Sequence, residues 1–563
     1  MVININSFVR LARFCACFVL ALSFTFSPAY AHQAGVATAH PLATEAAHQI
    51  LAQGGNAFDA AVAATATLAV VEPAGSGIGG GGFWLLHRAE DGFETMLDGR
   101  EMAPGKAHRD MYLDKDGNVI PRASIDGPLA AGIPGVPAAL AHLAENYGNL
   151  ELAKSLIPAI RYAREGFTID AHMRNLIKFR QSALLASPAA AEIFLVNGEI
   201  PPLGHEIVQT DLANTLQLIA DTNGKGFYQG EFANILASGV QSAGGIWQVE
   251  DLINYKLVER EPIRGEYHGI KITSASPPSS GGVALVSMLN ILEGFDLDNI
   301  PLVQRKHLVI EAMRRAYRDR AQYLGDADFI DIPVERLTNK TYSSGLRAGI
   351  HQTKATPSSL LPSAVNNTGN GTDTTHFSII DGDGNRVAAT LSVNYPFGSG
   401  FMVPGTGVIL NDEMDDFSAK PGIANAYGLA GAEANSIQPG KRPLSSMSPT
   451  FIEDEKNIVI LGTPGGSRII TMLLLSILEY ANGGYADSIV KLRRYHHQYL
   501  PDKVVYEEGA LSDAEILQFE KWGHSVEKHR STFGNMQVVI IDKNSETVSA
   551  ASDPRRGGQA SVK

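Results

Sequence analysis

Residues 375–394 restrict the fold more tightly than any other stretch of this chain. Their sequence, THFSII-DGDGN-RVAATLSVN, holds two runs of alternating residue character around an Asp/Gly/Asn turn, which predicts a β-hairpin. If the turn is symmetric about Asp383, then Thr374, just before the first strand, lies opposite Ser392. One face of the hairpin is then almost wholly apolar and the other polar, and this separation fixes the register of a half-buried sheet.

The facing hydroxyls of Thr374 and Ser392 have two interpretations. At about 5 Å apart, with the amide of Asn394 nearby, they could form a Thr/Ser ladder that only stabilises the sheet. The preceding residues 351–373 are rich in Thr, Ser, Pro, Asn and Gly, however, and predict a mobile loop. Cleavage of the Asp373–Thr374 bond at the end of this loop would give the threonine a free α-amine, which can act as base for its own hydroxyl.

Three partial matches to ligand-binding motifs are better explained as backbone features. Gly75, Gly77 and Gly80 match G-x-G-x-x-G, but a helical pattern precedes them and a strand pattern follows, the reverse of a dinucleotide site. They predict a passage without side chains that other elements approach closely. D-x-D-x-N in the hairpin and DKDGN at Asp114 resemble the start of a calcium loop but lack its glycine, so both are interpreted as turns.

Residues 1–31 are predicted to form a secretory signal peptide. Arg10 and Arg13 precede an apolar run, and Ala29 and Ala31 give an A-x-A cleavage pattern. The run is shorter than the ~20 residues of a membrane span, so we expect no stable membrane anchor and an exported protein, periplasmic or secreted. Both cysteines lie in this segment. The mature chain is therefore expected to have no disulfide, thiolate metal site or thiol nucleophile.

The rest of the chain has the composition of a globular protein, with 44% hydrophobic and 19% charged residues among 563. The formal net charge of −13 argues against a nucleic-acid partner, which requires a basic surface. Helical patterns dominate before the predicted loop, beginning with two helices between His40 and Pro73 that are separated at Gly54-Gly55. Strand patterns dominate after Thr374.

Motifs along the chain resemble those of the γ-glutamyltranspeptidases, N-terminal-nucleophile hydrolases that mature by self-cleavage. The resemblance runs from about His40 to the C-terminal region and rests on HPLATEA, GGNAFDAAVA, GIGGGGF, DGREMAP, DGPLAAGIPG, TTHFSI, NDEMDDFSAKPG, GKRPLSSMSPT, GTPGGSRII and HHQYLPD. It implies an α+β fold, a four-layer αββα sandwich with two stacked, mainly antiparallel sheets. It also implies a precursor that divides into residues 32–373 and 374–563, which stay together as a heterodimer because both build one core.

The resemblance also implies roles for single residues. Thr374 would be the nucleophile, and Gly465 and Gly466 would offer backbone N–H groups to the developing oxyanion. Arg100 would bind the α-carboxylate of a γ-glutamyl group, because its guanidinium matches a carboxylate with two parallel hydrogen bonds. The other implied site residues are Ser445 and Ser446 for the same carboxylate, Glu413 and Asp416 with Asn394 for the substrate's α-ammonium, and Ser392 where the family often has Thr.

Two further features are interpreted through the resemblance. Residues 420–441 resemble a lid loop of many family members, with Tyr427 as the gating aromatic. His376, His496 and His497 are interpreted as structural hydrogen-bonding groups, because the α-amine already supplies a base and no H-E-x-x-H spacing is present.

The implied reaction is acyl transfer, for which no metal or organic cofactor is expected. Thr374 attacks the γ-amide of glutathione or a related γ-glutamyl compound, Cys-Gly leaves, and a γ-glutamyl ester forms on the threonine. Water completes hydrolysis, and an acceptor amino acid or dipeptide completes transpeptidation. Two alternatives stay open. One is a glutaryl- or cephalosporin-type acylase of the same fold, which would have no use for Glu413 and Asp416, and the other is a secreted, non-enzymatic binding protein with a decayed site.

Overall fold

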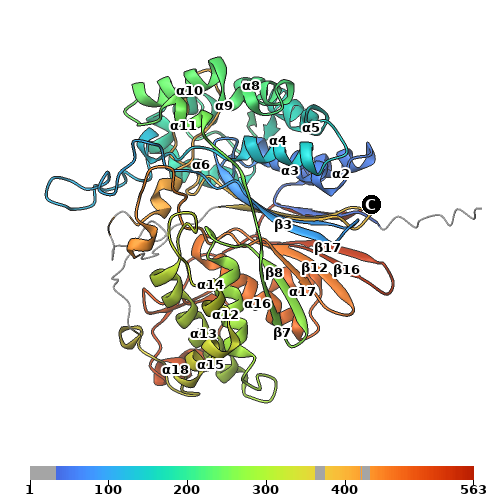
Figure 1. The fold of residues 1–563 in the computed structure, drawn as a ribbon, viewed down its shortest axis with the longest axis vertical. Helices are drawn as coiled ribbons and strands as arrows, with labels where there is room; N and C mark the ends of the chain where they lie inside the picture. The colour runs from blue at the N-terminus through green and yellow to red at the C-terminus, as the bar shows by residue number, and fades with distance from the viewer. Residues whose placement is uncertain (1–32, 362–373, 419, 421–431) are drawn as a thin grey trace, which may run out of the picture.

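Two antiparallel sheets stack face to face, and helices cover the outer face of each (Figure 1). The computed structural model describes residues 33–361, 374–418, 420 and 432–563. Its four layers, helices, sheet, sheet and helices, are the αββα sandwich predicted from the sequence.

The first sheet has seven strands, all paired antiparallel. Their spatial order is β18 (Gln559–Val562), β1 (Gly35–Thr38), β9 (Thr375–Ile380), β10 (Arg386–Ser392), β2 (Gly81–Arg88), β3 (Phe93–Asp98) and β6 (Val258–Arg260). The predicted hairpin therefore forms the centre of this sheet, between strands from the first part of the chain.

The second sheet has six strands, also antiparallel. Their order is β17 (Val548–Ser552), β16 (Gln537–Asp542), β12 (Asn457–Gly462), β11 (Thr450–Glu453), β8 (Ile270–Ser274) and β7 (Ile263–Tyr267). Small sheets pair β4 (Phe167–Thr168) with β5 (Glu206–Ile207), and β14 (Val504–Tyr506) with β13 (Tyr495–His496) and β15 (Val526–Lys528).

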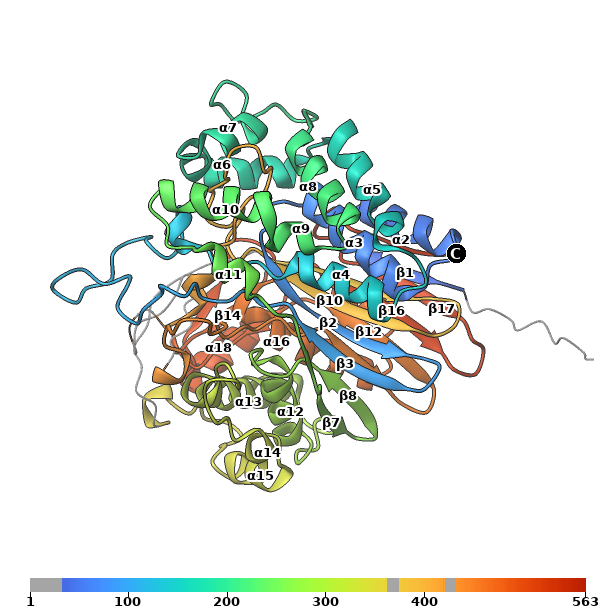
Figure 2. The ribbon, with the colours of Figure 1, turned by 45° about the horizontal axis from the view of Figure 1, so that its top comes forward.

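The helices form two groups, one outside each sheet (Figures 1 and 2). Outside the first sheet lie α2 (Pro41–Ala52), α3 (Ala57–Val71), α4 (Val136–Asn146), α5 (Leu152–Glu165), α6 (Ala171–Leu185), α7 (Pro188–Phe194), α8 (Thr210–Asp221), α9 (Lys225–Tyr228), α10 (Gly230–Ser242) and α11 (Val249–Ile253). Outside the second lie α12 (Gly281–Leu292), α13 (Leu302–Tyr323), α14 (Val334–Leu337), α15 (Lys340–Ala348), α16 (Ile469–Ala481), α17 (Ala486–Lys491) and α18 (Asp513–Lys521). Among the described residues, no helix combines the length and apolarity needed to cross a membrane.

The hairpin register agrees with the sequence prediction. Arg386 pairs with Ile380 and Leu391 with Thr375, and continuing this register places Thr374 opposite Ser392. The expectation of one buried and one polar face is wrong in one respect, because every residue of both strands is buried. The apolar face packs on the helices, and the polar face packs against the second sheet rather than facing water.

The two sheets come very close at His376, on the polar face of β9. Its imidazole is hydrogen-bonded to the hydroxyls of Thr390 (2.8 Å) and Ser378 (3.2 Å), so it is satisfied within its own sheet. A Cβ atom on Gly462 of β12 would lie only 2.2 Å from Cε1 of this ring. Only glycine allows this approach. Gly80 has a similar role, because a Cβ there would lie 2.2 Å from the carbonyl oxygen of Ser392.

The hairpin turn is joined to the start of α3. Asp381 accepts hydrogen bonds from the backbone N–H groups of Asp383 (3.0 Å) and Asn385 (2.9 Å), as a turn residue does. Its second oxygen accepts from the N–H of Ala57 at 2.8 Å, where the helix leaves a donor unsatisfied. The D-x-D-x-N motif therefore serves as a turn and a helix contact.

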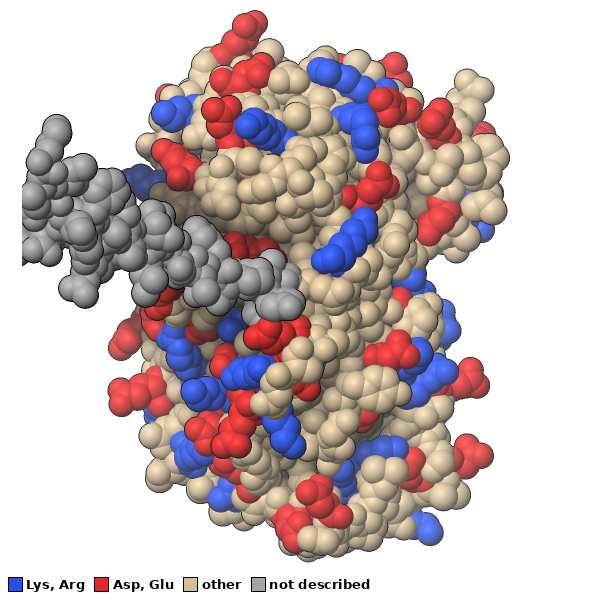
Figure 3. All heavy atoms as spheres, turned by 90° about the vertical axis from the view of Figure 1, so that its right-hand side faces the viewer, with Lys and Arg blue, Asp and Glu red and all other residues tan. Residues whose placement is uncertain are grey.

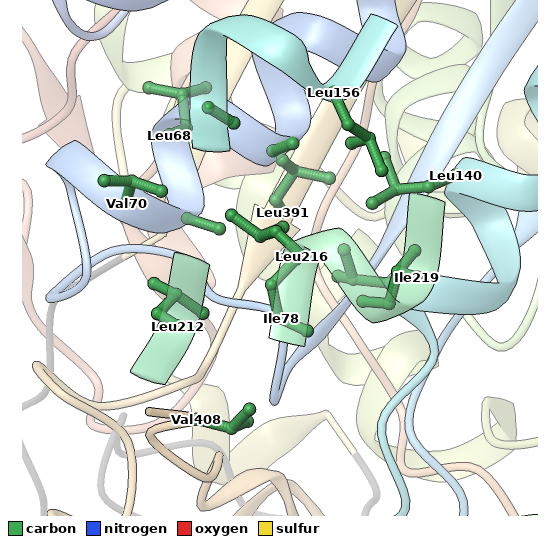
Figure 4. Close-up of a cluster of buried hydrophobic side chains, with 14 of the residues drawn as sticks. Leu68, Val70, Ile78, Leu140, Leu156, Leu212, Leu216, Ile219, Leu391 and Val408 are labelled. Carbon is green, nitrogen blue, oxygen red and sulfur yellow. The ribbon is translucent and has the colours of Figure 1, made fainter. Parts of the chain in front are cut away.

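The core above the first sheet is built from small and branched side chains. All fifteen residues of α3 are buried, which agrees with its nearly continuous apolar sequence. Leu391 of β10 points into a cluster with Leu68 of α3, Leu156 of α5 and Leu216 of α8 (Figure 4). Residues far apart in sequence thus enclose the central hairpin.

Several predictions fall wholly or partly outside the described residues. These are the signal peptide at 1–31, Asp373 of the cleavage site, the end of the predicted loop and Tyr427. Within the loop, the described part up to residue 361 is mostly exposed and is held to the protein at two buried residues, Ala355 and Ser358. There the hydroxyl of Ser358, which is buried, donates to the carbonyl of Tyr499 at 2.7 Å.

Candidate active site

One pocket brings together most of the residues that the sequence marked. It is lined by Arg100, Arg320, Thr374, Ser392, Asn394, Asp416, Ser445, Ser446, Met447, Gly466, Ser467 and Ile469. The other two predicted residues are adjacent, since Glu413 contacts Arg100 and Gly465 precedes Gly466. The pocket lies where loops after β3, β10 and β12 meet the start of β9.

Thr374 is buried at the entrance to β9, with 3% of its surface exposed. Opposite it, the hydroxyl of Ser392 accepts a hydrogen bond from the N–H of Asn394 at 2.7 Å. Asn394 has a φ of +74°, a backbone conformation that asparagine tolerates better than most residues. Its side-chain amide donates to the carbonyl of Asp412 at 2.9 Å. The end of β10 is therefore held rigidly beside the threonine.

Arg100 is the centre of a buried ion-pair cluster. Its terminal nitrogens donate to Glu413 at 2.6 Å and to Asp416 at 2.5 Å, and its Nε donates to the carbonyl of Pro443 at 3.2 Å. The two carboxylates lie on one 3₁₀ turn, Glu413–Asp416, as expected from their spacing. The predicted carboxylate-binding cation and the predicted ammonium-binding anions are thus paired with each other in this structure.

Burial shifts the pKa values of the carboxyl groups in this cluster. Burial and the Asp416 charge raise the pKa of Glu413 to about 7, although Arg100 and the nearby Ser392 hydroxyl oppose the increase. Burial also raises the pKa of Glu101 well above its ordinary value, with a further contribution from Glu413. Among the described residues, Oε1 of Glu413 has no hydrogen-bond partner. The cluster therefore contains a buried acceptor that a positively charged ligand group could satisfy.

The hydroxyl oxygens of the adjacent serines Ser445 and Ser446 both accept hydrogen bonds from the protein. Oγ of Ser445 accepts from the N–H of Met447 at 3.0 Å, and Oγ of Ser446 accepts from Nη2 of Arg320 at 3.2 Å. Each hydroxyl has only one hydrogen to donate. Because both oxygens already accept from protein donors, both hydrogens stay available for an acceptor on a ligand.

The glycine turn Gly465-Gly466 has a backbone that only glycine adopts without strain, with φ of +141° and +58°. It leads through the 3₁₀ turn Gly466–Arg468 into α16. Backbone N–H groups at the start of a helix have no intrahelical partners. This turn can therefore direct N–H groups towards an anionic oxygen.

The three histidines singled out in the sequence are buried hydrogen-bonding groups outside the pocket lining. Burial lowers the pKa of His376 and of His496 to about 3, and that of His497 to about 4. His496 Nδ1 bonds the hydroxyl of Thr471 at 2.8 Å, and His497 Nε2 bonds Asp502 at 3.2 Å. Both contacts agree with the structural interpretation.

Sequence reasoning did not identify Arg320 or Glu72. Arg320 lies in RRAYRDR on α13, where the pattern of charges is typical of a solvated helix face, although the residue is buried. Glu72 follows α3 and accepts a hydrogen bond from the hydroxyl of Thr375 at 2.5 Å. A lone glutamate after a helix carries no signal for such a position, since its partner is about three hundred residues away.

Among the residues that the structure describes, one group of side chains has the composition of a metal site. His307, Glu311 and His524 offer ligand atoms within 4.8 Å of one another. The two imidazoles are hydrogen-bonded to each other at 2.7 Å, and Glu311 accepts from Arg314 at 3.2 Å and Arg315 at 2.6 Å. Two guanidinium groups beside the carboxylate oppose a cation there.

Comparison with known proteins gives a consistent result. The family model described as Gamma-glutamyltranspeptidase matches residues 43–563. The chain is 41% identical over 535 residues to a glutathione hydrolase proenzyme of Escherichia coli, covering 94% of this chain and 92% of that protein. It is 35% identical over 534 residues to an Acylase ACY 1 proenzyme of a Pseudomonas species, covering 93% and 92%.

Solved structures show the same relationships. A cephalosporin acylase from Bacillus halodurans superposes with a TM-score of 0.82 at 28% identity, over 94% of this chain and 96% of that chain. A γ-glutamyltranspeptidase from Helicobacter pylori superposes with a TM-score of 0.56 at 43% identity, over 57% of this chain and 92% of that chain. The chain is an enzyme of the hydrolase type and belongs to the γ-glutamyltranspeptidase family.

Proposed function

We propose that this enzyme is a self-cleaving γ-glutamyltransferase and glutathione hydrolase with Thr374 as its nucleophile. The observation that carries the proposal is one pocket that joins Thr374 to the Arg100 cation, the Asp416 carboxylate and two serine hydroxyls. A γ-glutamyl group has a reactive carbonyl, an α-carboxylate and an α-ammonium, and the pocket offers a partner for each. The relatives named glutathione hydrolase proenzymes support the same class of substrate.

Maturation would begin with attack of the Thr374 hydroxyl on the carbonyl carbon of Asp373. The C–N bond breaks, the threonine nitrogen gains the proton, and an ester links Asp373 to the threonine oxygen. Water then hydrolyses this ester and leaves a carboxylate on Asp373 and a free α-amine on Thr374. The proenzyme names of the relatives support this step. The H. pylori chain, which matches only 57% of this one, supports division into two fragments.

Fragments 32–373 and 374–563 would remain together after cleavage. β9 and β10 from the second fragment are hydrogen-bonded between β1 and β2 from the first. Separation would break two strand ladders and expose the core on both faces of the sheet. The mature enzyme is therefore proposed to be a heterodimer of two parts of one precursor.

In the catalytic cycle the α-amine takes the proton of the Thr374 hydroxyl as its oxygen attacks the γ-carbonyl. The N–H groups of Gly465 and Gly466 would stabilise the negative oxygen of the tetrahedral intermediate. The amine of the leaving group, Cys-Gly for glutathione, departs with a proton, and a γ-glutamyl ester remains. Water or the amine of an amino acid or dipeptide then attacks the ester and restores the threonine.

Recognition of the γ-glutamyl group would use the ion-pair cluster. Its α-ammonium would contact Glu413 and Asp416, and Asn394 lies beside them. Its α-carboxylate would accept from Arg100 and from the hydroxyls of Ser445 and Ser446. Because the ligand carries both charges, it can replace part of the internal ion pairing without leaving a buried charge unpaired.

We also propose that the enzyme is exported, to the periplasm or the medium, on the basis of the signal-like sequence at 1–31. The structure supports small-molecule rather than nucleic-acid partners. Basic and acidic side chains are interspersed over the face drawn in Figure 3, and no extended basic area is formed by its described residues. Cell fractionation with activity measurement tests the location, and activity confined to the cytoplasm would contradict it.

The decisive test of the main proposal is the state of the purified chain. Denaturing gels of active enzyme should show two fragments, and N-terminal sequencing of the smaller should begin at Thr374. Thr374→Ala should remain a single chain and release no nitroaniline from γ-glutamyl-p-nitroanilide, whereas Arg305→Met, altered far from the pocket, should split normally. An active enzyme that is wholly uncleaved would refute self-activation.

An acylase acting on glutaryl or cephalosporin side chains is the second candidate, because acylases are among the relatives. A glutaryl group lacks the α-ammonium, so Glu413 and Asp416 would have no ligand group to bind. Comparing kcat/KM for γ-glutamyl-p-nitroanilide and glutaryl-p-nitroanilide separates the candidates. A strong preference for the γ-glutamyl compound supports the transferase, and the opposite preference supports the acylase.

A further inference from the structure

Arg320 is a buried cation that faces the candidate pocket from α13. Only 4% of its surface is exposed, and it belongs to the pocket lining. Its Nε donates to the hydroxyl of Ser280 at 2.9 Å and its Nη2 to the hydroxyl of Ser446 at 3.2 Å. Both partners are neutral, so these contacts satisfy N–H groups without neutralising the charge.

The neighbouring arginine is in a different state. Arg100 is paired with Glu413 at 2.6 Å and with Asp416 at 2.5 Å. Arg320, in contrast, has no carboxylate within ion-pair distance among the described residues. Burial lowers its pKa, with a further contribution from the Arg100 charge, although the charges of Tyr317 and Asp416 oppose the decrease. The protein therefore compensates the Arg320 charge only in part. Arginine does not lose its proton in proteins, and buried charges are normally paired. The position therefore calls for an anion from outside the chain.

The contacts of Arg320 also organise both members of the serine pair. By donating to Ser446, it leaves the hydrogen of that hydroxyl to point elsewhere. Ser280 accepts from Arg320 and in turn donates to the backbone carbonyl of Ser445 at 2.7 Å. The backbone N–H of Ser280 donates to the same carbonyl at 2.8 Å. Arg320 thus contacts the hydroxyl of Ser446 directly and is linked to the main chain of Ser445 only through Ser280.

We infer that Arg320 is a specificity-determining residue that provides the positive charge for the substrate's α-carboxylate, acting through the hydroxyl of Ser446. This inference rests on the proposed function of the pocket. In this arrangement Arg320 supports the part of the carboxylate site that Ser445 and Ser446 form, whereas Arg100 is also paired with Glu413 and Asp416. A merely structural role for Arg320 predicts that all substrates are affected alike. A role in recognition predicts an effect only on substrates that carry the carboxylate.

The test compares Arg320→Met with Arg305→Met on two anilides. Arg305 lies on the same helix and is partly exposed, and its nearest carboxylate is that of Asp298 at 3.9 Å. The substrates are γ-glutamyl-p-nitroanilide and 4-aminobutanoyl-p-nitroanilide, which has hydrogen in place of the α-carboxylate. Arg320→Met should lower kcat/KM for the first by about 10- to 150-fold, the range for a lost hydrogen bond to a charged group. It should change kcat/KM for the second by less than about threefold.

Arg305→Met should leave both rates at the wild-type level. Arg320→Lys keeps the charge but not the two-directional donor geometry, so it should recover part of the loss on the γ-glutamyl substrate. An equal loss of both substrates in Arg320→Met, or wild-type kcat/KM with the γ-glutamyl anilide, would overturn the inference.

A binding measurement separates failure of this inference from failure of the proposed function. Calorimetry of Thr374→Ala with L-glutamate and with 4-aminobutanoate needs no turnover. Adding Arg320→Met should weaken the binding of glutamate by about 10- to 150-fold, as for kcat/KM with the γ-glutamyl anilide, and should leave the affinity for 4-aminobutanoate unchanged. If wild-type enzyme cleaves no anilide, the proposed function fails, but selective loss of glutamate binding still supports Arg320. The inference would be overturned if Thr374→Ala and the double variant bound glutamate equally well. It would also be overturned if Thr374→Ala, which retains Arg320, bound no glutamate.

Discussion

Arg100 and Glu413 form an ion pair of 2.6 Å in which both side chains are buried, although they are 313 residues apart in sequence. One comes from the loop after β3 and the other from a turn after β10. The pair lies in the proposed γ-glutamyl site, so a ligand that carries both charges must compete with it. Its protonation state should therefore control binding.

The first prediction concerns pH. The pKa of Glu413 is raised to about 7, mainly by burial, so this carboxyl is neutral below that pH and negative above it. The negative form attracts the substrate's α-ammonium. Binding of L-glutamate to Thr374→Ala should strengthen roughly tenfold from pH 6 to pH 8, following the ionised fraction. Calorimetry across this range measures the effect.

Glu413→Gln provides the control for this pH dependence, because it keeps the shape of the side chain without the titrating proton. Its glutamate affinity should be weaker at pH 8 and nearly constant between pH 6 and pH 8. A Gln variant that retains the wild-type profile would assign the titration to another group.

The second prediction concerns Ser392, whose hydroxyl accepts from the N–H of Asn394 at 2.7 Å beside Thr374. Ser392→Thr keeps that hydroxyl and should keep maturation and kcat within about threefold. Ser392→Ala leaves a buried N–H without its acceptor, and should lower kcat roughly tenfold or slow fragment formation to a similar extent. Time courses on denaturing gels and anilide kinetics measure both. Equal behaviour of the two variants would argue that the hydroxyl has no part in the site.

The third prediction concerns stability at the start of β9. The Thr375 hydroxyl donates to the half-buried carboxylate of Glu72 at 2.5 Å. Thr375→Val removes the donor while preserving β-branching and should lower the free energy of unfolding by about 1–2 kcal/mol. Thr375→Ser keeps the donor and should lose less. Urea unfolding of precursors that also carry Thr374→Ala, which stay uncleaved, checks this order, and a more stable Val variant would contradict it.

The fourth prediction concerns the contact between the two sheets. A Cβ on Gly462 would lie 2.2 Å from Cε1 of His376, and both residues are buried. Gly462→Ala should therefore destabilise the protein by about 1–3 kcal/mol. Removing the ring as well, in Gly462→Ala with His376→Ala, should give a smaller loss than the sum of the two single changes.

Gly345 is the matched control for this substitution. It lies in α15, and nothing stands within 4 Å of the position where a Cβ would be. Gly345→Ala should therefore stabilise the helix by up to about 1 kcal/mol. If thermal unfolding shows the same change for Gly345→Ala and Gly462→Ala, the close approach of the sheets is not the cause.

The sequence specified local structure well where a pattern is repeated over neighbouring residues. The alternation in residues 375–394 predicted the hairpin and its register, because a shift by one residue would reverse both faces. The glycines before β2 predicted a close backbone passage, and the spacing of Glu413 and Asp416 predicted that one turn presents both. Motif resemblance then marked most of the pocket, including Thr374.

Only the tertiary structure decided what each marked residue contacts. It placed the polar face of the hairpin against a second sheet instead of water. The imidazole of His376 can be buried there because it is hydrogen-bonded to side chains of its own sheet. It paired Arg100 with the carboxylates of Glu413 and Asp416. It also placed Arg320 against the hydroxyl of Ser446, although the sequence presents Arg320 as an ordinary charge on a helix. A local sequence pattern shows the period of a single helix or strand. It does not show which distant element will bury that helix or strand. Burial and pairing with distant residues determine the charge and the role of each side chain.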